Sequence, residues 1–232
     1  MLRPQAVLAV VLSYALSLMP LYGFPAPVIG TVTSATSARV GATSASVGST
    51  VFGGDFLSTE KNGSIQVRAG AARLMLSGAS SATLATREGT PSATLLSGTA
   101  VFSTAGAKAF VLHAAKADIR PKTDEPTVGQ VTYVNDKELR VRSTRGTLAI
   151  TVEDDTQFVA EGMAYRVILD PDEYYAREAA GQGPQGAGTK GRKEPRRAGR
   201  SRFLLIAIAV VSVATGIVAY EAWVSPDGSH GP

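Results

Sequence analysis

Glycines at nearly even intervals constrain this chain more than any other feature of its sequence. From residue 62 onward they stand 7, 8, 11, 9 and 8 residues apart. They occur in the pairs Asn62-Gly63, Ala69-Gly70, Ser77-Gly78, Glu88-Gly89, Ser97-Gly98 and Ala105-Gly106. This spacing is typical of short strands joined by tight turns, because glycine adopts the positive φ that such turns need. Asn-Gly is the strongest hairpin signal, and it predicts a left-handed turn at Gly63.

Between the turns, apolar and polar residues alternate with a period of two. Ile65 and Val67 lie on one predicted face, and Gln66 falls between them. No window of this region has a sustained helical period. The pattern predicts an all-β fold of stacked short antiparallel strands, solenoid-like or prism-like. We expect one domain over residues 28–170, because the part after the polar joint at 121–127 would make a thin core alone.

The N-terminal residues 1–26 have the layout of a secretory signal. Arg3 precedes an apolar run from Ala6 to Leu18, and Pro20 and small residues follow. A positive start, an apolar middle and a looser end are what a signal peptide requires. The cleavage site is poorly marked, since a large residue occupies a position where a small one is preferred. An uncleaved signal anchor is therefore the alternative.

A second apolar segment lies near the C-terminus. Residues 203–220, FLLIAIAVVSVATGIVAY, carry no charge and have the length at which a helix begins to span a bilayer. Tyr220 and Trp223 stand where interfacial aromatic residues belong. The segment predicts one C-terminal transmembrane helix, followed by a short tail at 221–232. Residues 171–202 are expected to form a flexible basic linker that is attracted to the lipid bilayer.

The two apolar segments disagree about the side of the membrane that the domain occupies. A signal sequence exports residues 28–170 and leaves the basic stretch at 190–202 outside. The positive-inside rule instead places that stretch in the cytoplasm. Long translocated domains override local charge, so we expect a periplasmic domain held in the membrane by a single C-terminal span.

The net charge of +4 is unevenly distributed along the chain. Residues 190–202 hold seven arginines and lysines and one glutamate, which gives this stretch +6 and leaves −2 for the rest. We infer that the folded part lacks the basic face that phosphate binding requires, and we expect no nucleic acid partner.

Residues with catalytic or metal-binding chemistry are few. The chain has no cysteine, and its two histidines are His113, within a predicted strand, and His230 in the tail. One imidazole in the domain cannot build a histidine metal site, and Asp154 and Asp155 are expected to form a turn rather than a calcium site. We therefore expect no catalytic, metal-binding or cofactor-binding residues, and a protein that is not an enzyme.

Gly181, Gly183 and Gly186 satisfy the dinucleotide-binding pattern G-x-G-x-x-G in letters only. Such a site needs a strand before the glycines and a helix after them. Here an alanine-rich stretch precedes them and a basic run follows. A linker that binds no cofactor is therefore expected.

The central region resembles a FecR-type domain. The matching segments are VFGGDFLST at 51–59, GSIQV at 63–67, LLSGTAV at 95–101 and FVL at 110–112. The resemblance covers roughly residues 45–120 and extends toward residue 169. It implies an extracytoplasmic β-domain in bacterial envelope signalling, where fuller relatives pass a signal from an outer-membrane receptor to a cytoplasmic anti-sigma segment. The family supplies no catalytic residues.

An anti-sigma segment is not expected here, because the residues before 28 form the predicted signal and the tail after Trp223 is short. We expect a membrane-tethered extracytoplasmic FecR-like binding or signalling module, with an envelope protein or a cell-wall polymer as its partner. The alternative is a structural cell-envelope protein whose serine- and threonine-rich strand faces bind polysaccharide or peptidoglycan.

Overall fold

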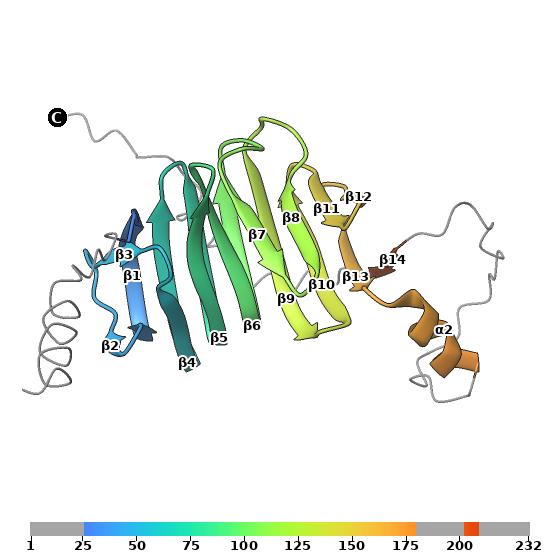
Figure 1. Ribbon diagram of the computed structural model, residues 1–232, viewed down its shortest axis with the longest axis horizontal. Coiled ribbons are helices and arrows are strands. Elements are labelled where there is room, and N and C mark those ends of the chain that lie inside the picture. Colours follow the sequence, from blue (N-terminus) through green and yellow to red (C-terminus); the bar gives the residue numbers. More distant parts are fainter. Residues whose placement is uncertain (1–25, 180–201, 209–232) are drawn as a thin grey trace, which may run out of the picture.

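Four long strands, each bent near its middle, shape the domain in the computed structural model, which describes residues 26–179 and 202–208. They are β1 (Val28–Val40), β4 (Phe56–Ala69), β5 (Ala72–Arg87) and β6 (Thr90–Thr104), and Figure 1 shows them side by side. The pairing register shifts near the middle of β1, β4 and β5, where the hydrogen-bonded ladder is interrupted. Each long strand therefore consists of two short halves.

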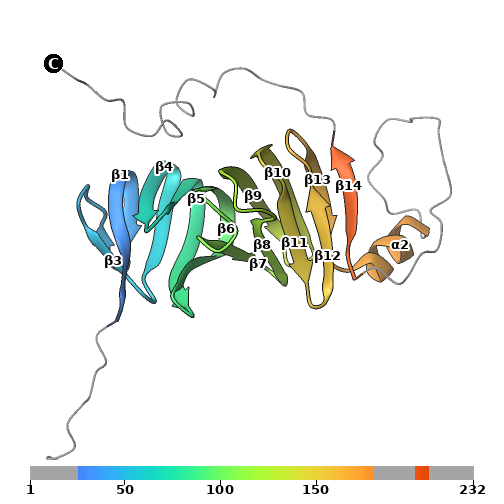
Figure 2. The same ribbon diagram turned by 90° about the horizontal axis from the view of Figure 1, so that it is seen from above.

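The halves belong to two layers, which Figure 2 shows from above. The first layer continues from β6 through β7 (Val111–Ala114), β8 (Ala117–Pro121), β11 (Leu148–Val152) and β12 (Asp155–Val159). The second layer continues through β9 (Thr127–Asn135), β10 (Glu138–Arg145), β13 (Ala164–Ile168) and β14 (Leu204–Ile208). The short strands β2 (Thr43–Ser44) and β3 (Thr50–Phe52) pair with β1 at the other end.

Strand β6 is where the two layers divide. Its residues Ser92–Leu95 pair in parallel with β7, and its residues Gly98–Thr104 pair antiparallel with β9. All fourteen strands form one open sheet that is folded over along the bends. The expected all-β fold is confirmed, although its units are long bent strands rather than separate short ones.

The core lies between the two layers and follows the predicted period of two. Along β5, Leu74 and Leu76 are buried while Arg73 and Met75 alternate with them on the outer side. The rings of Phe102 and Phe110 meet inside with centroids 5.9 Å apart. Burial of such side chains stabilises the domain by about 1.5–3 kcal/mol each.

The glycines predicted as hairpin turns divide into two kinds. Gly70 and Gly89 end strands in tight turns, with φ of 59° and 78°. Gly63, Gly78 and Gly98 instead lie inside β4, β5 and β6, at the bends. The predicted Asn62-Gly63 hairpin is wrong, and Gly63 is not among the glycines with positive φ.

Close approach between neighbouring bends explains the glycines that do not turn. A Cβ at Gly63 would lie well under 3.0 Å from the carbonyl oxygen of Ser37. A Cβ at Gly78 would lie equally close to the carbonyl oxygen of Lys61. The buried polar groups there are paired, since Ser80 N donates to Thr59 Oγ1 at 3.0 Å. The bends of β1, β4 and β5 therefore stack because these positions carry no side chain.

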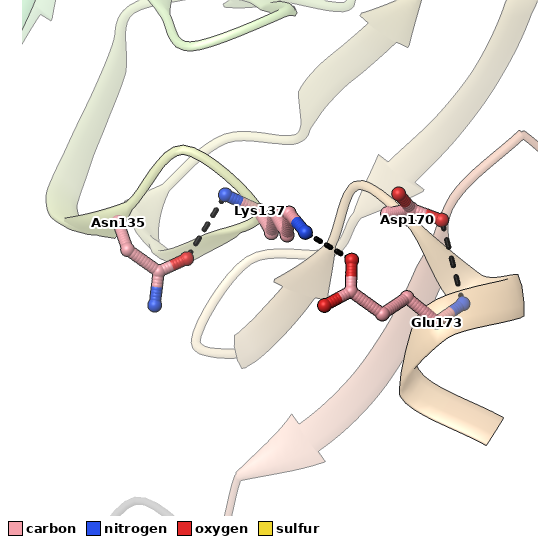
Figure 3. A network of polar contacts seen from close by, with 4 residues as sticks. All are labelled: Asn135, Lys137, Asp170 and Glu173. Carbon is pink, nitrogen blue, oxygen red and sulfur yellow. Dashed lines mark hydrogen bonds and ion pairs between the residues drawn. The ribbon is translucent and has the colours of Figure 1, made fainter. Parts of the chain in front are cut away.

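A helix after residue 170 contacts the end of the second layer through side chains. Helix α2 (Pro171–Ala179) begins at Asp170, whose Oδ1 accepts a hydrogen bond from Glu173 N at 3.4 Å. Figure 3 shows Glu173 paired with Lys137, whose own N donates to Asn135 Oδ1 at 2.9 Å. The first residues of the predicted flexible linker are thus held at the β9–β10 turn, and residues 180–201 lie outside the described part.

Strand β14 corrects the prediction for the C-terminal apolar segment. Leu204–Ile208 pairs antiparallel with Ile168–Ala164 of β13, so a helix that starts at residue 203 is wrong for these residues. A run of leucine and isoleucine suits an edge strand as well as a membrane helix, and hydropathy alone does not separate the two. Within the described residues, no helix has the length and apolar character that crossing a membrane requires.

Parts of two predicted segments lie outside the described residues. Residues 209–220, the remainder of the predicted transmembrane helix, lie outside the described residues. So do residues 1–25, which form almost all of the predicted signal.

Candidate functional site

An open polar pocket on the outer face of the first layer is the strongest candidate site. It has a volume of about 620 Å³ and is formed by β5, β6, β7, β8 and β11. His113 and Asp118 lie in it, with the cationic side chains of Arg87, Lys108 and Arg120 around them. The sequence placed His113 in a predicted strand, but it did not predict that these residues gather in one place.

His113 and Asp118 meet because they are paired positions of the β7–β8 hairpin. His113 Nδ1 lies 2.5 Å from Asp118 Oδ1. His113 Nε2 is buried and has no hydrogen-bond partner. The contact with Asp118 fixes the orientation of the imidazole ring in the wall of the pocket.

The surroundings keep Asp118 ionised. The hydrogen bond from His113 is the largest cause that lowers the pKa of Asp118, and the charges of His113, Arg87 and Arg120 lower it further against the opposing effect of burial. The carboxylate thus holds the imidazole in place at neutral pH and stays negative itself.

We expect His113→Ala to raise the pKa of Asp118 toward its ordinary value of 3.8. A carboxyl group whose folded-state pKa is lowered gives stability above its unfolded pKa, and this stability is lost as the pH falls through the folded-state pKa. The carboxyl carbon shift of Asp118, followed by NMR during an acid titration, measures the change. Arg120→Gln is the control with a smaller rise, and an unchanged Asp118 titration in His113→Ala would contradict the hydrogen bond.

Hydroxyl groups extend this site along the sheet in a hydroxyl row. In this row each residue is paired with the next one on the neighbouring strand. The row consists of Thr83, Thr94, His113, Asp118, Thr151 and Thr156. Thr151 Oγ1 and Thr156 Oγ1 are 3.0 Å apart, within hydrogen-bond distance. Short hydroxyls beside a carboxylate and an imidazole suit a ligand that is rich in hydroxyl or oxyanion groups.

Within the described residues that line the pocket, no hydroxyl group is hydrogen-bonded to His113. Ser92 borders the pocket, but its hydroxyl donates to the carbonyl oxygen of Ala85 at 3.3 Å and is almost completely buried. Among the residues that the structure describes, no three histidine, aspartate or glutamate side chains gather as metal ligands.

The other residues considered from the sequence lie apart from this pocket. Asp154 lies in the turn between β11 and β12, and Asp155 begins β12. Asp155 Oδ2 accepts a hydrogen bond from Arg202 N at 3.0 Å, so this acidic turn holds the entry to β14. His230 and the glycines of 181–186 are outside the described residues.

Sequence reasoning treated His113 as a strand residue and missed its partner. The signal was present, because His113 and Asp118 flank the two-residue turn Ala115-Lys116, and a tight hairpin places such positions opposite one another. Arg87 gave no comparable signal, since it ends β5, which is distant in sequence from β7, whereas Lys108 lies in the loop that precedes β7.

Comparison with known proteins gives distant structural matches. No family model matches this sequence, and no curated protein matches it. Two crystal structures of a candidate anti-sigma factor from Parabacteroides distasonis ATCC 8503, at 2.50 Å and 1.65 Å resolution, match with a TM-score of 0.41 and 14% sequence identity. The match covers 49% of this chain and 54% of that one, so this chain spans about half the length of the protein it matches.

Proposed function

We propose that this protein is a membrane-tethered extracytoplasmic binding or signalling module of the FecR-like kind, and that it is not an enzyme. The observation that carries the proposal is the open pocket that the paired His113 and Asp118 line, with three cationic side chains and the carboxylate of Glu88 around them. A pocket with convergent polar groups is suited to recognition.

Either of two apolar segments can supply the proposed tether. Their lengths as helices decide which of them can span a bilayer. While Leu204–Ile208 stays in the sheet, residues 209–220 would measure about 18 Å as a helix, which is short of a hydrocarbon core of about 30 Å. Residues 6–24, which carry no charge, would measure about 28 Å. This comparison favours an uncleaved signal anchor while β14 is paired, and a C-terminal span once β14 is released.

Cysteine labelling tests both the export and the tether, because the chain has no cysteine of its own. We expect Ser34→Cys, an exposed position of β1, to react with a membrane-impermeant maleimide in cells whose outer membrane alone is permeabilised. Protection of this position until the cells are lysed would contradict an extracytoplasmic domain.

A second cysteine, Ser229→Cys, identifies the tether in the same experiment. Labelling of both positions without lysis is expected for a signal anchor with β14 paired. Labelling of Ser34→Cys alone is expected for a C-terminal span. Release of the whole protein from the membrane fraction by carbonate would contradict either tether.

A structural role in the envelope is the second candidate, and the hydroxyl row favours it. Thr94 and Thr151, both half-buried, flank the His113–Asp118 pair in this row, and hydroxyl groups suit hydrogen bonding to sugars. Co-sedimentation of the full chain with purified cell wall, reduced by Thr94→Val, supports this candidate. Capture of one discrete envelope protein, with no cell-wall binding, supports the signalling module instead.

A further inference from the structure

Exposed apolar side chains gather at the end of the domain that β1 and β3 form. In the part of the chain that the structure describes, nine large hydrophobic side chains are exposed, and four of them lie within residues 28–56. These four are Val28, Val47, Phe52 and Phe56. Val28 and Phe52, which are 64% and 41% exposed, are directly paired between β1 and β3. An exposed apolar surface marks a site of contact with another protein or with a membrane.

The same end of the domain carries almost no charge. Between residues 28 and 57 the sequence holds only two charged side chains, Arg39 and Asp55. Asp55 Oδ2 accepts a hydrogen bond from Phe52 N at 2.8 Å, so this carboxylate is used within the turn that follows β3. A surface with few charged groups loses little hydration when it meets lipid.

The opposite end of the domain is acidic. Figure 1 shows β1, β2 and β3 at one end and β12, β13, β14 and α2 at the other. Residues 153–175 hold seven aspartates and glutamates and one arginine, which gives this stretch −6. Ion pairs of Glu153 with Arg202 and of Glu173 with Lys137 reduce this excess but do not remove it. The long axis of the domain therefore runs from an apolar end to an acidic end.

The chain enters the domain at the apolar end. Pro27 precedes β1, and its carbonyl oxygen accepts a hydrogen bond from Gly53 N at 2.8 Å, which fixes residue 27 beside the end of β3. Residues 6–24 carry no charge and are the proposed signal anchor. Val28 follows residue 24 by four positions, which span at most about 14 Å even when fully extended. An anchor that ends at residue 24 thus keeps the exposed pair close to the lipid headgroups.

We propose that the β1–β3 end of the domain lies on the membrane surface, with Val28 and Phe52 in the headgroup region of the lipid bilayer that holds residues 6–24. This depth suits an aromatic ring, because aromatic residues are enriched at membrane–water interfaces. Anionic headgroups repel the acidic end, so the domain stands with its long axis pointing away from the membrane. This inference rests on the proposed function, and within it on a signal anchor that stays uncleaved.

The orientation has a consequence for the His113 pocket. The pocket lies on β7 and β8, which are four and five strands from β1 in the order of the sheet. With strands about 4.8 Å apart, these positions are about 19–24 Å from the end that contacts lipid. The pocket is thereby held clear of the membrane and stays open to a ligand.

Two single-cysteine variants in the same local setting test the lipid contact. Thr50→Cys in β3 and Thr156→Cys in β12 are both exposed, and each lies two positions before an exposed phenylalanine, Phe52 or Phe158. Each full chain carries an NBD fluorophore at its cysteine and is reconstituted in vesicles of phosphatidylcholine and phosphatidylglycerol. Lipids with a nitroxide near the headgroup are expected to quench the label at position 50 about threefold more than the label at position 156, because β12 is seven strands from β1, about 34 Å.

A change of the contacting side chain tests Phe52 itself. Phe52→Asp brings a charge to the headgroup region, so quenching of the label at position 50 should fall about twofold or more. Phe158→Asp, at the far end, is the matched control and should leave quenching at position 156 unchanged. Circular dichroism checks that both variants are folded. Equal quenching at positions 50 and 156, or undiminished quenching in Phe52→Asp, overturns the lipid contact.

Other outcomes assign this end of the domain elsewhere or separate the inference from the proposed function. A disulfide between two copies of Thr50→Cys, without lipid quenching, would make this end an interface between copies. A protein that resists carbonate extraction but has lost residues 1–26, as mass spectrometry would show, overturns the lipid contact and keeps a C-terminal span. Release by carbonate, or protection of Ser34→Cys until lysis, overturns the proposed tether or the proposed export instead.

Discussion

Gly98→Ala is expected to destabilise the domain by about 3 kcal/mol or more, because two penalties coincide at this bend of β6. Gly98 has a φ of 77°, which costs an L-residue about 1–2 kcal/mol. A Cβ there would also lie well under 3.0 Å from Ser80 Cα and Cβ. Overpacking of this kind costs about 1–3 kcal/mol. Ser80 cannot yield freely, since its Oγ accepts a hydrogen bond from Thr99 N at 2.8 Å.

Two further glycines separate these penalties. Gly162 has a φ of 76° with open space around it, so Gly162→Ala carries the conformational cost alone, about 1–2 kcal/mol. Gly63→Ala carries the steric cost alone, because Gly63 does not have positive φ but lies against Ser37. Unfolding in urea measures all three free energies. Equal losses in Gly98→Ala and Gly162→Ala would show that the bends do not approach as closely as described.

Phe203→Ala is expected to cost about 3–5 kcal/mol of domain stability, as truncation of a buried aromatic side chain does. Phe203 is 0% exposed and belongs to the core between the layers. Its carbonyl oxygen accepts a hydrogen bond from Gln157 Nε2 at 2.9 Å, and β14 follows directly. If residues 203–220 formed a membrane helix instead, this substitution would leave the unfolding of the β-domain unchanged.

Phe158→Ala is the matched control for this prediction. Phe158 lies in β12 of the same domain but is 49% exposed, with Lys122 Nζ 4.3 Å from its ring centroid. An exposed cation–π contact contributes about 0.5–1 kcal/mol, so a loss near that size is expected. Similar losses in the two variants, measured by urea unfolding, would place Phe203 outside the core.

The second layer shows why net charge was an incomplete guide to surface charge, because its strand segments carry six arginines and one carboxylate, Glu138. The inference that the domain lacks a basic face used the total charge outside residues 190–202. The acids of the domain lie mostly in turns, such as Glu88 and Asp154, whereas the arginines of the second layer lie at alternate strand positions. Absence of a nucleic acid partner stays a prediction.

The sequence by itself determined the features that depend on neighbouring residues. Alternation along segments such as Leu74–Leu76 set which side chains enter the core, because successive side chains of a strand point to opposite faces. Glu88-Gly89 set a tight turn, because both residues adopt positive φ, 51° and 78°. The strand character of His113 also followed from its local pattern.

Only the tertiary structure decided what depends on contacts between distant segments. Whether Gly63 ends a strand or bends one depends on the approach of Ser37, 26 positions earlier, which no local pattern encodes. Leu204–Ile208 forms a strand because it pairs with the edge of the sheet at β13. The hydrogen bonds of this pairing satisfy the backbone N–H and C=O groups along that edge, which outweighs the tendency of the same apolar residues to form a helix. Arg68 and Arg145 share a pocket because four strand pairings in succession bring them into one row, and a pairing partner is a property of the assembled sheet rather than of either residue.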